Sequence, residues 1–266
     1  KCGTEVDTVA EGDWAIVFCN GAPDGYGYPD KIFGYDTPGS IGVLAKQIKM
    51  QAKQLIPIPA NSAYSLEQWA AFSLRYITAW SNWELAYGTF RLLIGQDELP
   101  NPQVWGWGGG VTMGELALAR HAGCETTQIA STDERLAAIA GLGLTPLDRR
   151  GFSDLYYDKK RFRKDEDYTA AYSAAEKTFL AEVRERTGGD MVNIFVDFVG
   201  SPVFRATLKA LARQGVITTA GWKEGMMIDL VRASECIARH QHVHTHYARY
   251  SQGVAAVEFA EANGWL

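Results

Sequence analysis

The stretch "VWGWGGGVTMG", from Val104 to Gly114, decides how this chain folds. An apolar start runs into four glycines, and a helical pattern follows them. A glycine turn between a strand and a helix presents backbone N–H groups that hold a pyrophosphate at the positive end of the helix. Such a turn usually has a further glycine where this chain has Thr112. The stretch indicates a dinucleotide site with one altered position; the alternative is a glycine-rich loop without a ligand.

The residues around this turn predict the fold class. From Gln103 onward, short apolar or β-branched runs alternate with helical patterns; the runs are "QVWGW", "TTQIAS", "VNIFVDFVG" and "GVITTAG", and the helical patterns are Met113–Ala122, Asp133–Gly141, Ala171–Thr187 and Val203–Gln214. Strands that alternate with helices form βαβ units with right-handed crossovers. We therefore predict an α/β fold with a Rossmann-type, doubly wound parallel sheet.

The first seventy residues have a different character. Asp13–Cys19 is a short apolar run that predicts a strand, and a stretch dense in Gly, Pro, Asp and Asn follows it. Ser65 and Gln68 have the spacing of a capping box, so a helix is expected to begin there. We expect this part of the chain to be rich in β-structure.

Composition excludes several classes of protein. With 266 residues, 47% of them apolar, the chain is long enough for one or two domains with sizeable cores. Its net charge of −5 and the lack of a long basic run argue against nucleic-acid binding. No apolar segment approaches the ~18 residues of a membrane span, and no signal peptide is visible. The four cysteines form no CxxC pair, so we expect neither a disulfide framework nor a zinc loop, and a cytoplasmic location.

The second predicted strand indicates which cofactor the turn prefers. An NAD site would place Asp or Glu at the tip of this strand to bind the ribose hydroxyls. Here the tip is Ala130-Ser131, and Arg135 follows one turn into the next helix. A hydroxyl and a guanidinium suit a 2′-phosphate, which favours NADPH over NADH. The alternative is that Arg135 is an ordinary solvated helix charge.

The stretch "RHQHVHTHYARY" places a histidine at every second position, at His240, His242, His244 and His246. On one strand, all four side chains would point to the same face, where they could ligate zinc or nickel. Neighbouring side chains of one strand are poorly arranged for a closed tetrahedral shell. We therefore favour a strand at the end of the sheet with partly exposed imidazoles at a subunit contact, and we expect no metal site.

Several stretches, in their order and spacing, resemble the medium-chain dehydrogenase/reductases, and among these the crotonyl-CoA carboxylase/reductases. They are "IFGYDTPGSIGVLAKQIKMQAKQLIPIP", "ITAWSNWELAYG", "VWGWGGGVTMGELALARHAGC", "IASTDERLAAIAGLGLTPLDRRGF", "VNIFVDFVGSPVFRATLKALARQGVITTAG" and "THYARY", with the long insert Asp154–Thr187. The resemblance implies a partial GroES-like, β-rich catalytic domain over residues 1–72 and a Rossmann NADPH-binding domain over residues 73–266. It also implies chemistry without zinc.

The resemblance further implies an NADPH-dependent oxidoreductase that reduces an α,β-unsaturated acyl thioester carried by CoA or acyl carrier protein. Carboxylating members trap the resulting enolate with CO2, and other relatives protonate it. An aromatic–acid pair and a histidine hold CO2 or its ordered water in the family; by position these are Tyr35, Asp36 and His246. Asp36 is one methylene shorter than the family's Glu, and Arg249 stands where the family usually has Asn.

The expected cofactor-binding residues follow from the turn and from the resemblance. Gly108, Gly109, Gly110 and Val111 would cradle the pyrophosphate; Ser131, Arg135 and Arg149 would hold the adenosine 2′-phosphate end; Thr78, Ala220 and Gly221 would border the nicotinamide. Trp222 follows closely, whereas core packing is the favoured role of Trp107. A homodimer or homotetramer is expected. The alternative is a catalytically silent relative that serves as a nucleotide-binding or protein-interaction scaffold.

Overall fold

The computed structural model describes residues 1–18, 21, 23–29, 31–32, 36, 44–220, 237–245 and 247–266. Contacts divide the chain into two compact units, one formed by Lys1–Ser81 with Tyr247–Leu266 and the other by Asn82–His246. The long helix α1 (Leu66–Leu93) contributes residues to both units. The predicted domain boundary at residue 72 remains a prediction.

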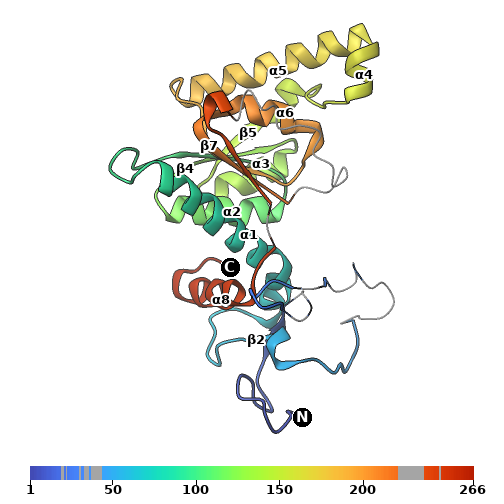
Figure 1. The fold of residues 1–266 in the computed structure, drawn as a ribbon, viewed down its shortest axis with the longest axis vertical. Helices are drawn as coiled ribbons and strands as arrows, with labels where there is room; N and C mark the ends of the chain where they lie inside the picture. The colour runs from blue at the N-terminus through green and yellow to red at the C-terminus, as the bar shows by residue number, and fades with distance from the viewer. Residues whose placement is uncertain are drawn as a thin grey trace. The chain divides into compact units, whose positions relative to one another are not determined.

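The second unit is built on a six-stranded parallel sheet (Figure 1). Its spatial order is β5-β4-β3-β6-β7-β8, so the chain runs outward from β3 to one edge and returns to the other side of β3. The strands are β3 (Gln103–Trp107), β4 (Glu125–Ala130), β5 (Thr145–Asp148), β6 (Val192–Asp197), β7 (Leu211–Thr219) and β8 (His242–His244). This order is that of the doubly wound nucleotide-binding sheet and confirms the predicted fold class.

Helices cover both faces of this sheet. In Figure 1, α5 and α6 lie over one face, and α2 and α3 lie over the other. These helices are α2 (Gly110–His121), α3 (Asp133–Gly141), α4 (Lys159–Lys164), α5 (Glu166–Arg186) and α6 (Ser201–Ala210), with the short 3-10 helix η2 (Arg149–Phe152) after β5. The predicted helical patterns agree well with α2 and α3, whereas α5 begins earlier than the predicted Ala171. The predicted helix Val203–Gln214 was too long, because α6 ends at Ala210 and residues 211–214 belong to β7.

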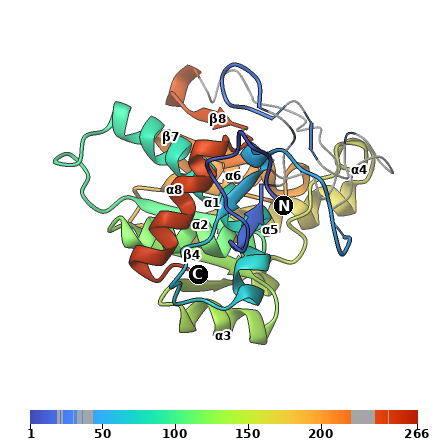
Figure 2. The same ribbon diagram turned by 90° about the horizontal axis from the view of Figure 1, so that it is seen from below.

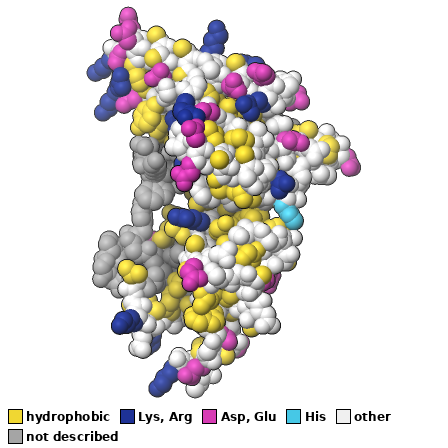
Figure 3. All heavy atoms as spheres, turned by 180° about the vertical axis from the view of Figure 1, so that it is seen from behind, with side chains coloured by type: hydrophobic (Ala, Val, Ile, Leu, Met, Phe, Trp, Pro, Cys, Tyr) yellow, Lys and Arg dark blue, Asp and Glu magenta, His cyan; other side chains and the backbone are white. Residues whose placement is uncertain are grey.

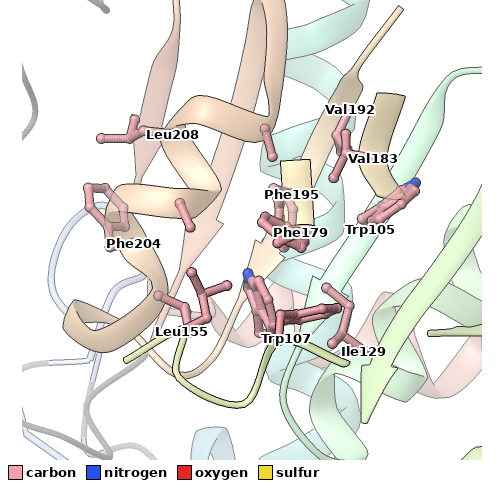
Figure 4. Close-up of a cluster of buried hydrophobic side chains, with 14 of the residues drawn as sticks. Trp105, Trp107, Ile129, Leu155, Phe179, Val183, Val192, Phe195, Phe204 and Leu208 are labelled. Carbon is pink, nitrogen blue, oxygen red and sulfur yellow. The ribbon is translucent and has the colours of Figure 1, made fainter. Parts of the chain in front are cut away.

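The core of the second unit lies between the sheet and the α5–α6 layer (Figure 4). Trp107 of β3 is 1% exposed, and its ring lies 5.8 Å from that of Phe195 and 5.0 Å from that of Phe179. Its indole N–H donates a hydrogen bond of 2.8 Å to Thr207 Oγ1, so the polar atom of this large side chain is satisfied. Trp107 is a core residue, as the sequence favoured.

The insert that carries α4 and α5 is anchored to α6 by one polar cluster. The buried Glu176 carboxylate accepts hydrogen bonds from Arg205 (3.3 Å), from Lys209 and from the Tyr172 hydroxyl (3.1 Å). Acidic side chains cap both helices, because Asp158 accepts from the N–H groups of α4 and Asp165 from those of α5. The upper part of Figure 3 shows basic and acidic side chains mixed on the surface in this region.

The first unit contains a two-stranded antiparallel sheet of β1 (Ala15–Val17) and β2 (Leu55–Pro57), the 3-10 helix η1 (Ala52–Gln54) and the C-terminal helix α8 (Tyr250–Asn263). Figure 2 shows α8 beside α1. Contact is close, because a Cβ on Gly253 would lie 2.6 Å from Ile56 Cδ1 and 3.3 Å from Ile77 Cδ1. The predicted capping box forms at the start of α1, where Ser65 and Gln68 exchange hydrogen bonds. Within the described residues, no helix has both the length and the apolar character of a membrane span.

Candidate functional site

The candidate site lies where the order of the parallel strands reverses. β3 pairs with β4 on one side and with β6 on the other, and Trp107 stands opposite Asp197 at the carboxyl ends of β3 and β6. The chain leaves these two strands toward opposite faces of the sheet, and at such a point a crevice between the loops is expected. The Phe198 N–H donates to Trp107 O at 3.1 Å and fixes the two loops to each other. Doubly wound sheets bind their ligands at this point.

The glycine turn occupies the β3 side of this crevice. Gly108 has φ +138°, a conformation that side-chain-bearing residues rarely adopt. Gly109 is the N-cap of α2, and no side chain caps the helix there. A Cβ on Gly109 would meet nothing within 4 Å, and the first turn of α2 carries no acidic residue. The open N–H groups and the helix dipole therefore suit an anion at this end of α2.

Thr112 turns away from the ligand side of this turn. Its side chain is fully buried, and its hydroxyl donates a hydrogen bond of 3.0 Å to Trp107 O. A Cβ on Gly106 would lie 2.4 Å from Thr112 Cγ2, and a Cβ on Gly108 would lie 2.4 Å from Thr112 Oγ1. Glycines in and after the strand thus make room for the side chain, and the helix still packs closely on β3.

Gln128 of β4 is a further component of the turn, and the sequence interpretation did not select it. This side chain is fully buried, and its Nε2 donates to Gly108 O and Gly109 O at 3.3 Å each. Its Oε1 is buried without a hydrogen-bond partner. A glutamine inside the strand "ETTQIA" is the sequence feature that could have indicated this role. Only the pairing of Gly106 with Gln128 shows that the side-chain amide lies beside the glycine turn.

Two arginines lie at the predicted adenosine end of the site. Ala130 pairs with Asp148, so Ser131 and Arg149 follow adjacent strands at the same edge of the sheet. Arg135 is exposed, Arg149 is half-buried, and neither has an ion-pair partner among the described residues. Burial lowers the pKa of the Arg149 guanidinium. Within the described part of the chain, this edge therefore has two guanidiniums without an ion pair, and a hydroxyl.

Arg150, in contrast, is already neutralised. Its guanidinium lies 2.6 Å from Asp148 and 2.6 Å from Asp133, and hydrogen bonds to these two carboxylates raise the pKa of the arginine. Hydrogen bonds from Arg150 lower the pKa of Asp148. Asp133 and Asp148 are thus paired with Arg150 and form no ion pair with Arg135 or Arg149.

Two buried carboxyl groups lie on the elements that form the crevice. Asp197 Oδ1 accepts from the N–H groups of Val199 (2.8 Å) and Gly200 (2.9 Å), whereas Oδ2 has no partner. Burial raises the pKa of Asp197 to about 6, although these two hydrogen bonds lower it. Glu115 of α2 is fully buried, neither oxygen has a partner, and burial raises its pKa well above the usual range.

The other predicted site residues are placed as follows. The Thr78 hydroxyl donates to Leu74 O at 2.6 Å, and Asp36 Oδ2 accepts from the Ile32 N–H at 2.7 Å. Both belong to the first unit, whereas the glycine turn and Ala220, directly after β7, belong to the second. Tyr35, Gly221, Trp222 and His246 lie outside the described residues.

Only part of the histidine row forms a strand. β8 contains His242 and His244, whose rings are parallel within 3° with centroids 6.3 Å apart. His240 has φ +53°, in the left-handed region, so the extended conformation begins after it. His240 therefore does not share the strand face. Across the part of the chain that the structure describes, no three His, Cys, Asp or Glu side chains gather as a metal-ligand group.

Comparisons with known proteins agree with this geometry. The chain is 24% identical to a crotonyl-CoA reductase of Streptomyces avermitilis over 84% of its own length and 46% of that protein. It is 22% identical to a crotonyl-CoA reductase of Streptomyces collinus over 96% of its own length and 56% of the relative. The chain thus spans about half the length of the curated relatives it matches.

Solved structures share the fold. The crotonyl-CoA carboxylase/reductase AntE in complex with NADP matches with a TM-score of 0.63 and 20% identity, over 80% of this chain and 51% of that one. The 2-octenoyl-CoA carboxylase reductase CinF in complex with NADP and 2-octenoyl-CoA matches with a TM-score of 0.60 and 19% identity, over 79% and 44%.

A family model described as zinc-binding dehydrogenase matches residues 110–262, which is more than half of the chain. The match begins at the first residue of α2, covers β4 to β8 of the sheet and ends within α8. The protein belongs to the zinc-binding dehydrogenase family of the medium-chain dehydrogenase/reductases, as the resemblance implied.

Proposed function

We propose that this chain binds NADPH through its second unit and is part of an enzyme that reduces an α,β-unsaturated acyl thioester. The relatives named crotonyl-CoA reductase and the NADP-bound carboxylase/reductases of the same fold support the reaction class. The observation that carries the proposal is the glycine turn at the strand switch point, with unpaired guanidiniums at the neighbouring edge. An anionic dinucleotide matches both features.

In this proposal, the turn binds the pyrophosphate. The N–H groups of Gly108, Gly109, Gly110 and Val111 would donate to its oxygens, and the dipole of α2 would add about 0.3–1 kcal/mol. Thr112 does not obstruct this arrangement, because its side chain fills the notch beside Gly106 instead of the ligand side.

The residues near the adenosine 2′-phosphate would provide selectivity for NADPH over NADH. A half-buried guanidinium without a counter-ion, such as that of Arg149, is unfavourable until an anion arrives. A 2′-phosphate gives Arg135 and Arg149 a dianionic partner, and Ser131 an acceptor for its hydroxyl. NADH lacks this group, so it gains none of these charge-assisted hydrogen bonds.

The remaining predicted residues would take part in the proposed reduction. Bound NADPH supplies a hydride to the β-carbon of the thioester. Thr78 and the Ala220-Gly221 backbone would border the nicotinamide and orient it. His246 and Asp36 would hold CO2 or an ordered water at the α-carbon, with Tyr35 beside them. The acyl group would be carried by CoA or by acyl carrier protein.

The alternative is a silent relative that binds a nucleotide without turnover. It is favoured by the exposed Asp36, whose Oδ2 is occupied by the local Ile32 N–H. Quenching of tryptophan fluorescence by NADPH, followed by NADPH oxidation with short 2-enoyl-CoA thioesters, separates the two. Binding with oxidation supports the reductase, and binding without oxidation supports the silent relative. A wild-type chain that binds no NADPH contradicts both.

A further inference from the structure

The carbonyl groups of the glycine turn are held from behind by two side chains. Trp107 O accepts hydrogen bonds from Thr112 Oγ1 (3.0 Å) and from the Phe198 N–H (3.1 Å). Gly108 O and Gly109 O both accept from Gln128 Nε2 at 3.3 Å, and Gly109 O also accepts from the Met113 N–H at 3.0 Å. Three consecutive carbonyls are therefore directed into the protein.

This arrangement determines where the N–H groups of the turn point. In a planar trans peptide, the C=O of one residue and the N–H of the next point in opposite directions. Holding the carbonyls of Trp107, Gly108 and Gly109 inward thus turns the N–H groups of Gly108, Gly109 and Gly110 outward. These are the donors that an anion at the start of α2 would meet. Without such contacts, consecutive glycines would sample many other conformations.

The orientation of the Gln128 amide supports a role in this turn. Its Oε1 is buried and has no partner, which is an unfavourable state for a polar atom. The reversed amide would place Oε1 against the two carbonyl oxygens of Gly108 and Gly109, which would be worse. The strand therefore retains an unsatisfied acceptor in order to keep two donor contacts on the turn.

We propose that Thr112 and Gln128 are positioning residues that preorganise the turn for the pyrophosphate of a dinucleotide. This inference rests on the proposed NADPH binding and adds the residues that determine the shape of its phosphate cradle. Thr112 fixes the carbonyl of the last strand residue, and Gln128 fixes the next two. A ligand then meets a turn that is already ordered, so binding does not have to supply that ordering.

The test compares ligands that contain or lack a pyrophosphate. Thr112→Val keeps the shape of the side chain and removes the hydroxyl, and Gln128→Leu removes the amide. Each should weaken the binding of both NADPH and NADH by at least roughly three- to tenfold, the loss expected for one hydrogen bond, because Thr112 donates one hydrogen bond to the turn and Gln128 donates two. Adenosine 2′-monophosphate has no pyrophosphate, so its affinity should not change. Dissociation constants are measured by tryptophan fluorescence and calorimetry on the full chain.

Two matched variants control for stability. Thr112→Ser retains the hydroxyl and should bind all three ligands within about twofold of wild type. Thr187→Val removes a buried hydroxyl that donates to Val183 O at 2.8 Å in α5, away from the turn. It should lower the melting temperature without changing any of the three affinities. If Gln128→Leu does not fold, the isosteric Thr112→Val decides the matter.

Unchanged NADPH and NADH affinities in folded Thr112→Val and Gln128→Leu would overturn the positioning role alone. A similar loss for adenosine 2′-monophosphate would also overturn it, because general distortion of the site would then explain the effect. Failure of the wild-type chain to bind NADPH would instead overturn the proposed cofactor and this inference with it.

Discussion

Replacing Glu115 by Met should stabilise the protein, most strongly above neutral pH. Glu115 is 0% exposed, and neither carboxyl oxygen has a hydrogen-bond partner. Burial raises the pKa of this carboxyl well above its usual value, so the unfolded chain releases the proton more readily than the folded protein does. Met has a similar volume and no atom that needs a partner.

The sign of the pH dependence follows from that raised pKa. Ionisation of this carboxyl adds no penalty below its unfolded pKa of 4.5, where both states are protonated. As the pH rises from there through the folded pKa, wild type loses about 1.4 kcal/mol of stability per pH unit. The unsatisfied carboxyl oxygens add a penalty of about 1–3 kcal/mol at any pH.

Thermal and urea unfolding should be measured from pH 5 to pH 9 for wild type and Glu115→Met. A gain of about 2 kcal/mol corresponds to a melting temperature that is higher by roughly 4–8 °C for a unit of this size, and the gain should grow with pH. Two parallel pH profiles, or a variant less stable than wild type at pH 8, would refute the reasoning.

Glu176 provides the matched control, because it is 7% exposed and carries the same side chain in the opposite environment. Arg205, Lys209 and the Tyr172 hydroxyl all contact its carboxylate. Glu176→Met should destabilise the protein by about 1–3 kcal/mol, since it leaves these groups without their acceptor. The two substitutions should therefore have opposite signs.

Three further predictions concern the proposed activity. Arg135→Ala should weaken NADPH binding by roughly ten- to a hundredfold and leave NADH binding nearly unchanged. The control Arg163→Ala, at an exposed arginine of α4, should change neither affinity. Equal losses for both cofactors would argue against the 2′-phosphate assignment. Dialysis against EDTA, or added zinc, should leave turnover unchanged; loss on dialysis and recovery with zinc would show that a metal site was missed. With saturating bicarbonate and carbonic anhydrase, turnover should still yield mainly the protonated thioester, because Asp36 reaches less far than the family's Glu and ~1 Å of misplacement can cost about a hundredfold. Mass spectrometry with 13C-bicarbonate decides this point, and a dominant labelled product would contradict it.

The sequence predicted the parts of the fold that depend on neighbours along the chain. Alternating strands and helices gave the parallel sheet, and the Ser65–Gln68 spacing predicted the start of α1. Contacts between distant segments were not visible. Ser62 Oγ donates to Glu261 Oε2 at 2.7 Å across 199 positions, and no local pattern indicates that α8 returns to this first unit.

The site was predictable to a similar degree. Glycine spacing predicted the position of the turn, because glycine adopts backbone conformations that other residues rarely adopt. Gln128 and Glu115 were not selected, since a polar residue within an apolar pattern is normally read as solvent-exposed. Both are fully buried here. Their roles depend on the register of β4 against β3 and on the face that α2 presents, which the sequence alone does not specify.

Thr112 shows that the glycines of such a fingerprint provide space between the helix and the strand. The helix must approach the strand closely, so somewhere at their contact a side chain has to be absent. In the usual motif the helix omits it. In this chain the helix carries Thr112, and Gly106 and Gly108 leave the space free, since a Cβ on either would lie 2.4 Å from the threonine side chain. The exchange also provides a hydroxyl that binds Trp107 O, which a glycine cannot provide. Thr112 is therefore compatible with an ordered turn, because the glycines at positions 106 and 108 leave room for its side chain.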